Sequence, residues 1–135
     1  MMQTKIMYIE LKTNGLTGQG RICRVSISKT GYTLYYEDRI LKPVQGAPLR
    51  ANYYDTKTDE SFWISKPRKD GCDSLFAGKV EIDENARSEY WKSFRNKPAN
   101  VSKTYYQSSG KSKAEREKIE KGLRRKQPDT GRMPE

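Results

Sequence analysis

A basic loop beside an aromatic strand is the part of the sequence best suited to binding a charged ligand. Residues 65–71 read SKPRKDG and place three cations within four residues, directly after Phe62 and Trp63. Lysine and arginine are side chains that proteins use to hold phosphate groups, and proline stiffens the segment that carries them here. We interpret this loop as a phosphate-contacting segment, with a solvated basic loop as the alternative.

Aromatic side chains interleaved with cations are typical of proteins that bind single strands, because every base offers a face for stacking. Strand alternation puts Phe62 and Ile64 on one face and Trp63 on the other, so a buried pair would leave Trp63 exposed. The residues predicted to stack on bases are Tyr35, Tyr54 and Trp63. A place in the core or in a cross-strand pair is the alternative for each. The residues predicted to contact phosphate are Arg24, Lys42, Lys66, Arg68, Lys69, Arg124, Arg125 and Lys126.

The composition excludes several kinds of catalytic and metal site. The 135 residues include no histidine, which removes Ser-His and Cys-His catalysis and histidine-based zinc sites. Cys23 and Cys72 are too few for a four-ligand zinc site or a disulfide framework. The glycines of residues 15–20 match no nucleotide-binding loop, and the carboxylates of residues 70–84 lack the spacing of an EF-hand. We therefore expect no enzymatic activity, no cofactor, no metal and no small-molecule substrate.

Short strands closed by one helix are the expected architecture. Residues 21–28 alternate between apolar and polar side chains, and further short strands separated by tight turns follow as far as residue 82. Asp83 is placed to cap a helix over residues 84–95, whose aromatic residues recur at helical spacing. These elements predict an α+β domain, a small antiparallel barrel or strongly bent sheet (SH3-like or OB-like) with one amphipathic helix. A flat sheet with the helix across one face is the second interpretation.

The composition changes near residue 98. Residues 1–98 hold both tryptophans and most of the apolar side chains, whereas residues 99–135 are poor in apolar residues and rich in lysine and arginine. We therefore predict a β-rich domain over residues 1–98 and a basic tail over residues 99–135 that is flexible or nascent-helical. Ser112 and Glu115 have capping-box spacing, which favours a helix over about residues 113–126.

A strong positive charge points to anionic partners. The chain carries 27 Lys and Arg against 17 Asp and Glu, a formal net charge of +10. The predicted domain is itself basic, which favours nucleic acid. The N-terminal sequence lacks the apolar stretch of a signal peptide, and no apolar run is long enough to cross a membrane. With its few cysteines, the chain is expected to be a soluble cytoplasmic protein with no membrane partner.

Three stretches of the sequence resemble a family of small bacterial β-rich proteins to which no function is assigned. These stretches are GLTGQGRI (residues 15–22), KTGYTLYY (residues 29–36) and NYYDTKTDESFWISKPRKDG (residues 52–71). The resemblance covers about residues 5–96. It implies a compact β-rich domain and carries no activity or site residues with it.

Taken together, these patterns predict a non-enzymatic binding module. The first hypothesis is nucleic-acid binding with low sequence specificity, single-stranded DNA or RNA being favoured. The alternative is a protein-interaction module, an accessory or inhibitory factor that binds an acidic protein through a sheet edge or the tail helix. The surroundings of Trp63 discriminate between them, because cations around it favour nucleic acid and a contiguous apolar patch favours a protein.

Overall fold

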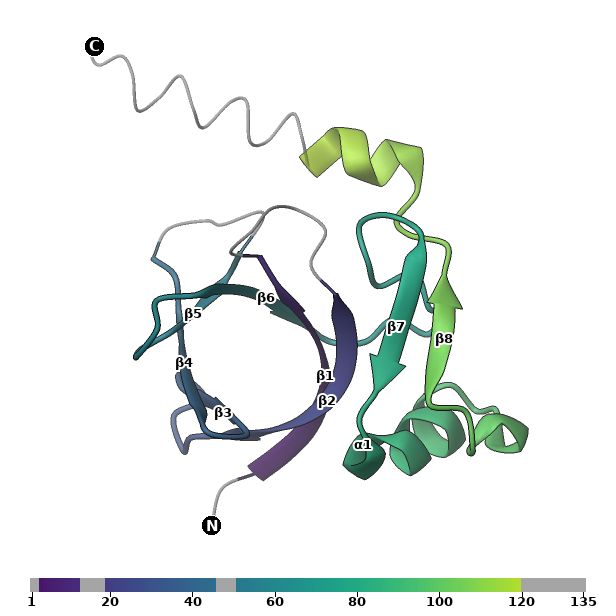
Figure 1. The fold of residues 1–135 in the computed structure, drawn as a ribbon, viewed down its shortest axis with the longest axis horizontal. Coiled ribbons are helices and arrows are strands. Elements are labelled where there is room, and N and C mark those ends of the chain that lie inside the picture. The colour runs from purple at the N-terminus through teal and green to yellow at the C-terminus, as the bar shows by residue number, and fades with distance from the viewer. Residues whose placement is uncertain (1–2, 13–18, 46–50, 120–135) are drawn as a thin grey trace.

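Six antiparallel strands close into a small barrel in the computed structural model, which describes residues 3–12, 19–45 and 51–119 (Figure 1). The strands are β1 (Gln3–Leu11), β2 (Gly20–Ile27), β3 (Leu34–Tyr36), β4 (Arg39–Pro43), β5 (Tyr53–Asp55) and β6 (Ser61–Ser65). Each strand pairs with the next one along the chain, and β6 pairs with β1 to complete the ring. The expected small antiparallel barrel is confirmed. Its consecutive, up-and-down strand order differs from the Greek key of an OB-fold.

Alternation along the strands separates the inside of the barrel from its outside. In β2, Cys23 and Val25 point inward, whereas Ile22 belongs to a second core on the outer surface. The inner core consists of Ile9, Cys23, Val25, Leu34, Leu41, Phe62 and Ile64. Because successive side chains of a strand point to opposite faces, the outward apolar residues of β1 and β2 need a second layer to cover them.

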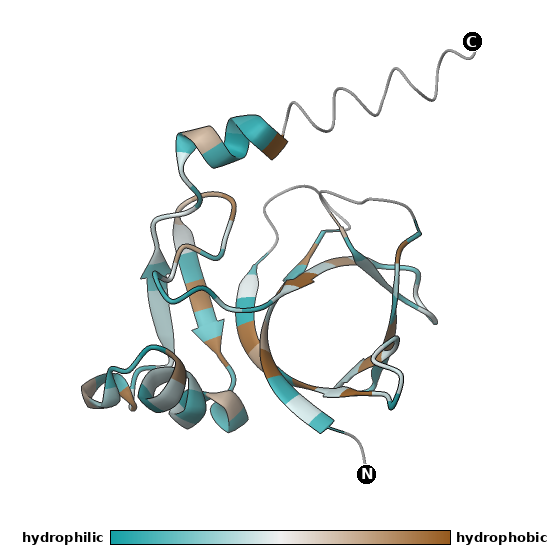
Figure 2. Cartoon of the chain, turned by 180° about the vertical axis from the view of Figure 1, so that it is seen from behind, coloured by the Kyte–Doolittle hydropathy of each residue, from teal (hydrophilic) through white to brown (hydrophobic). Residues whose placement is uncertain are grey.

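A lobe of two strands and a helix supplies that second layer. β7 (Gly78–Ile82) pairs in parallel with the start of β2, and β8 (Tyr105–Ser108) pairs with β7 as the last strand of the sheet. The lobe lies beside the β1–β2 wall of the barrel (Figure 1), and apolar and polar residues alternate along β7 (Figure 2). The outer core between lobe and barrel consists of Ile6, Tyr8, Ile22, Val80, Ile82, Ala86, Tyr90, Trp91 and Tyr106.

The expected helix is present, and its second half is π-helical. It runs through α1 (Glu84–Ser88) and η1 (Glu89–Phe94), and the 3-10 turn η2 (Pro98–Asn100) follows. Asp83 occupies the N-cap position, but the capping role predicted for its side chain is wrong. Its carboxylate instead accepts hydrogen bonds from Arg21 Nη1 (2.6 Å) and Tyr36 Oη (3.0 Å), because the start of the helix lies against the barrel wall.

The folded part extends beyond residue 98, where the composition placed its end. β8 lies in the segment assigned to the tail, and Tyr106 from this strand is only 9% exposed within the outer core. Residues 113–119 are helical, and the predicted capping box is confirmed: the Ser112 N–H donates to Glu115 Oε1 (3.3 Å) and the Glu115 N–H donates to Ser112 Oγ (3.2 Å). No helix within the described residues is long and apolar enough to span a membrane.

Candidate nucleic-acid interface

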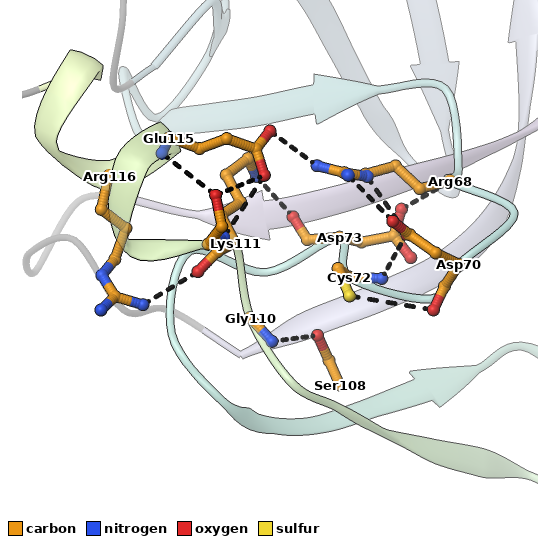
Figure 3. Close-up of polar contacts among 10 residues, drawn as sticks. Arg68, Asp70, Cys72, Asp73, Ser108, Gly110, Lys111, Glu115 and Arg116 are labelled. Carbon is orange, nitrogen blue, oxygen red and sulfur yellow. Dashed lines mark hydrogen bonds and ion pairs between the residues drawn. The ribbon is translucent and has the colours of Figure 1, made fainter.

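Arg68, the central cation of the basic loop, forms ion pairs with two carboxylates (Figure 3). Its Nε and Nη2 donate to the two carboxylate oxygens of Asp70 at 3.2 and 2.9 Å, and its Nη1 donates to Glu115 Oε2 at 3.0 Å. Hydrogen bonds from the Ser112 N–H and from Arg68 lower the pKa of Glu115. Two carboxylates therefore balance Arg68, whereas Lys66 and Lys69 remain exposed and available to a ligand.

A buried carboxylate fastens the same loop to β8. Asp73 is 2% exposed and accepts hydrogen bonds from the Arg68 N–H (2.6 Å) and the Tyr106 hydroxyl (2.5 Å). Lys111 Nζ donates to the Asp73 carbonyl oxygen (2.7 Å). Burial raises the pKa of Asp73, against the opposing effect of these hydrogen bonds, and burial lowers the pKa of Lys111. These contacts of Asp73 have a structural role, and no spacing in the sequence predicts them.

Trp63 and Arg24 contribute to the contact between barrel and lobe. As predicted, Phe62 and Ile64 face the inner core and Trp63 faces outward, but Trp63 is half-buried against the outer core. Arg24 pairs with Glu89, and its Nε donates to the Asn85 carbonyl oxygen at 3.2 Å. Both side chains therefore help to hold the helix on the barrel wall, which leaves them less available for a ligand than expected.

Three of the predicted residues lie on the outer surface of the barrel, which we call the barrel face. Lys42 of β4 lies opposite Tyr54 of β5, and Tyr35 of β3 lies opposite Ile40 of β4. Leu41 between Ile40 and Lys42 is buried, which places its two neighbours on the outer side. The barrel face thus offers two half-buried tyrosines and one lysine. The predicted contacts Arg124, Arg125 and Lys126 lie outside the described residues.

A second surface, which the sequence did not predict, lies along β8. An open pocket of about 530 Å³, here called the β8 groove, is bounded by the end of η1, by η2 and by β8. Its lining residues are Trp91, Arg95, Lys97, Asn100, Ser102, Lys103, Thr104, Tyr105, Tyr106 and Gln107. Three of these ten residues are cations, three are aromatic and none is acidic. Cations interleaved with aromatic rings are the pattern expected of a single-strand site, and here they line a concave surface.

The two tyrosines of β8 lie on opposite faces of the strand. Tyr106 points into the outer core, whereas Tyr105 is 48% exposed and its ring lies 4.5 Å from Lys79 Nζ. The sequence Lys103-Thr104-Tyr105-Tyr106 already interleaves a cation with aromatic residues. The composition of residues 99–135 masks this signal, because the segment as a whole is poor in apolar side chains.

The groove takes its residues from three separate segments, so sequence spacing alone could not reveal it. Within the described part of the chain, no three residues of the types His, Cys, Asp and Glu are grouped to hold a metal ion. Cys23, whose pKa is raised by burial, and Cys72 are both free thiols. Comparison of the chain with protein-family models, curated protein sequences and solved structures finds no match.

Proposed function

We propose that this protein is a non-enzymatic module that binds nucleic acid with low sequence specificity through the β8 groove. The observation that carries the proposal is the lining of the groove, which combines Arg95, Lys97 and Lys103 with aromatic rings and includes no carboxylate among the residues that the structure describes. The chain as a whole carries a net charge of +10, so long-range attraction of a polyanion adds to the local charge.

Single strands are the favoured ligand because of Tyr105. Tyr105 lines the groove and its side chain is half-exposed. A base can stack on such a ring only when the base is not paired with a second base. Stacking is worth roughly 1–3 kcal/mol per base and tolerates any sequence, which accounts for low specificity. Both DNA and RNA satisfy this requirement.

The basic loop lies next to the groove and extends the same positive surface. Gly71 at its end is so close to Arg95 that an added Cβ would lie 2.9 Å from Arg95 Nη1. Lys69, two residues earlier, is exposed, as is Lys66. We include both lysines as secondary phosphate contacts. A cytoplasmic location is part of the proposal and is supported by the two free thiols.

Fluorescence anisotropy of a labelled single-stranded oligonucleotide tests the proposal. Log affinity should fall linearly with log salt, with a slope of about −0.7 for each phosphate contact on single strands. The double variant Lys97→Ala/Lys103→Ala should weaken binding to all sequences and flatten the slope by about 1.4. The matched control is Lys29→Ala/Lys57→Ala, which removes the same charge from two exposed positions of barrel turns outside the groove. Equal effects of the two double variants would show that only net charge matters and would contradict the proposal.

The open edge of β8 favours a second candidate function, binding of an acidic protein segment. β8 ends the sheet of the described residues, so its outer edge can pair with an added strand. The cations that line the groove would suit acidic side chains of that strand. This candidate takes first place if the oligonucleotide binds only weakly, loses affinity at physiological salt and is insensitive to substitutions in the groove.

A further inference from the structure

Arg95 is held in a fixed position by aromatic rings. Its guanidinium carbon lies 5.6 Å from the ring centroid of Tyr90, 5.5 Å from that of Trp91 and 5.6 Å from that of Tyr106. Its Nη1 donates to the Tyr90 hydroxyl at 2.7 Å. The π-helical turn contributes, since the Arg95 N–H donates to the Tyr90 carbonyl oxygen and so aligns residues five positions apart. We call this set of rings the aromatic cage.

Arg95 forms no ion pair with a carboxylate among the described residues. Arg21, Arg39 and Arg68, in contrast, each pair with two carboxylates. A guanidinium has five N–H donors in a planar fork, and the cage satisfies only one of them by a hydrogen bond, from Nη1. A rigid, partly buried cation that lines a pocket is therefore prepared to bind an anion.

We propose that the β8 groove seats one nucleotide unit, with its phosphate on Arg95 and its base across the open outer edge of β8 on Tyr105, which faces the other side of the strand. This inference rests on the proposed function and names the ligand that the site recognises. Lys97 and Lys103 line the same groove and add charge without the fixed geometry of the cage. A nucleotide provides the anion for the fork and the flat ring for Tyr105 in a single ligand.

The size of the groove supports one unit rather than a long tract. Its volume of about 530 Å³ lies within the range of pockets that hold small ligands, roughly 300–1,000 Å³. Arg95 loses little freedom when a ligand binds, because the cage already fixes it, and this raises the affinity for a single phosphate. A nucleoside monophosphate should therefore bind by itself, which a purely polyelectrolyte surface would not support.

Nuclear magnetic resonance titration of the full chain provides the first test. A nucleoside 5′-monophosphate at millimolar concentration should shift the backbone resonances of residues 95–107 and compete with a labelled single-stranded oligonucleotide. The corresponding nucleoside and inorganic phosphate should each bind at least about fivefold more weakly, since each lacks one half of the ligand. Absence of shifts with the monophosphate, or shifts spread evenly over the surface, would overturn the inference.

Charge-conserving substitutions provide the second test. Arg95→Lys keeps the charge but loses the fork, so oligonucleotide affinity should fall about tenfold or more, with the salt slope unchanged. The matched control Lys29→Arg adds a fork on an exposed barrel turn outside the groove and should stay within about twofold of wild type. Tyr105→Ala should weaken binding at least about fivefold, whereas Tyr32→Ala, which removes a tyrosine 47% exposed on a barrel turn, should not. Since Arg95 touches the outer core, urea unfolding curves establish that each variant is folded.

The outcomes separate this inference from the proposed function. If the wild-type chain binds no oligonucleotide, the proposed function fails. If the wild type binds and Lys97→Ala/Lys103→Ala weakens it, but Arg95→Lys and the monophosphate have no effect, the function stands and the nucleotide seat is wrong. Competition by an acidic peptide without competition by the monophosphate would assign the groove to a protein partner.

Discussion

Two adjacent tyrosines of β8 give the most direct test of how the lobe is built. Tyr106 is 9% exposed and Tyr105 is 48% exposed, so the same substitution probes opposite faces of one strand. Tyr106 stacks on Tyr90 with ring centroids 5.5 Å apart and meets Trp91 edge-on at 6.2 Å. Its hydroxyl donates to the buried carboxylate of Asp73. We predict that Tyr106→Ala strongly destabilises the protein and that Tyr105→Ala does not.

The expected magnitude comes from two contributions. Truncation of a buried aromatic ring to alanine costs about 3–5 kcal/mol, and a buried acceptor left without its donor costs about 1–3 kcal/mol. The sum is at least about 4 kcal/mol, a large part of the 5–15 kcal/mol typical of a whole domain. For Tyr105, the lost contact with Lys79 is worth about 0.5–1 kcal/mol at an exposed site. The two variants should therefore differ about fourfold or more in their effect on the free energy of unfolding.

Urea unfolding followed by tryptophan fluorescence is the assay, because Trp91 contacts Tyr106 and Trp63 packs on the same core. Tyr106→Phe keeps the ring and isolates the hydroxyl, so it should cost about 1–3 kcal/mol even if Tyr106→Ala does not fold. A loss below about 1 kcal/mol for Tyr106→Ala, or an equal loss for Tyr105→Ala, would refute the placement of β8 in the sheet.

Three further predictions concern the same lobe. Burial raises the pKa of Asp73 in the folded protein. The Asp73 carboxyl therefore contributes most to the free energy of unfolding at a pH below the pKa that it has in the unfolded chain, and this contribution is lost as pH rises through the raised pKa of the folded state. The stability of wild type relative to Asp73→Asn, measured by urea unfolding from about pH 4 to pH 7, should therefore fall as pH rises, and a rise would contradict this sign. A chain shortened to residues 1–98 lacks Tyr106 and should give no cooperative unfolding transition, whereas a sharp transition like that of the full chain would restore the boundary expected from composition. Glu115→Gln removes the charge that pairs with Arg68 and weakens the capping box, so hydrogen exchange over residues 113–119 should accelerate while exchange in β2 stays unchanged.

The barrel was predictable because its signals are local. Inward and outward positions of β2 and β6 follow from alternation, and the placement of Phe62 and Ile64 inside with Trp63 outside is correct. The helix after Asp83 and the capping box at Ser112 are likewise predicted by residues only a few positions apart in the sequence. In each case, the signal comes from residues a few positions apart in one strand or one helical turn, where local backbone geometry sets the direction of the side chains and the capping contacts.

The end of the folded part was not predictable in this way. β8 has four residues in a segment with few apolar side chains, and its stability comes from β7 and from aromatic partners 15 or more positions earlier in the chain. The apolar content of a whole segment is an average, so it does not reveal a single buried residue such as Tyr106. The same cause explains Asp83, whose side chain leaves the cap for Arg21 and Tyr36 because these two groups reach it only through the tertiary fold.

The sequence by itself determined the charge, the absence of histidine and the alternation from which the barrel follows. Only the tertiary structure decided which cations are paired with carboxylates and which are available to bind an anionic ligand. Arg68 and Arg24 are paired with carboxylates from distant segments, whereas Arg95 is held among rings and forms no ion pair with a carboxylate in the part of the chain that the structure describes. The physical reason is that the balance of a charge depends on which groups lie within a few ångströms, and the closed barrel with its attached lobe brings together groups far apart in the chain.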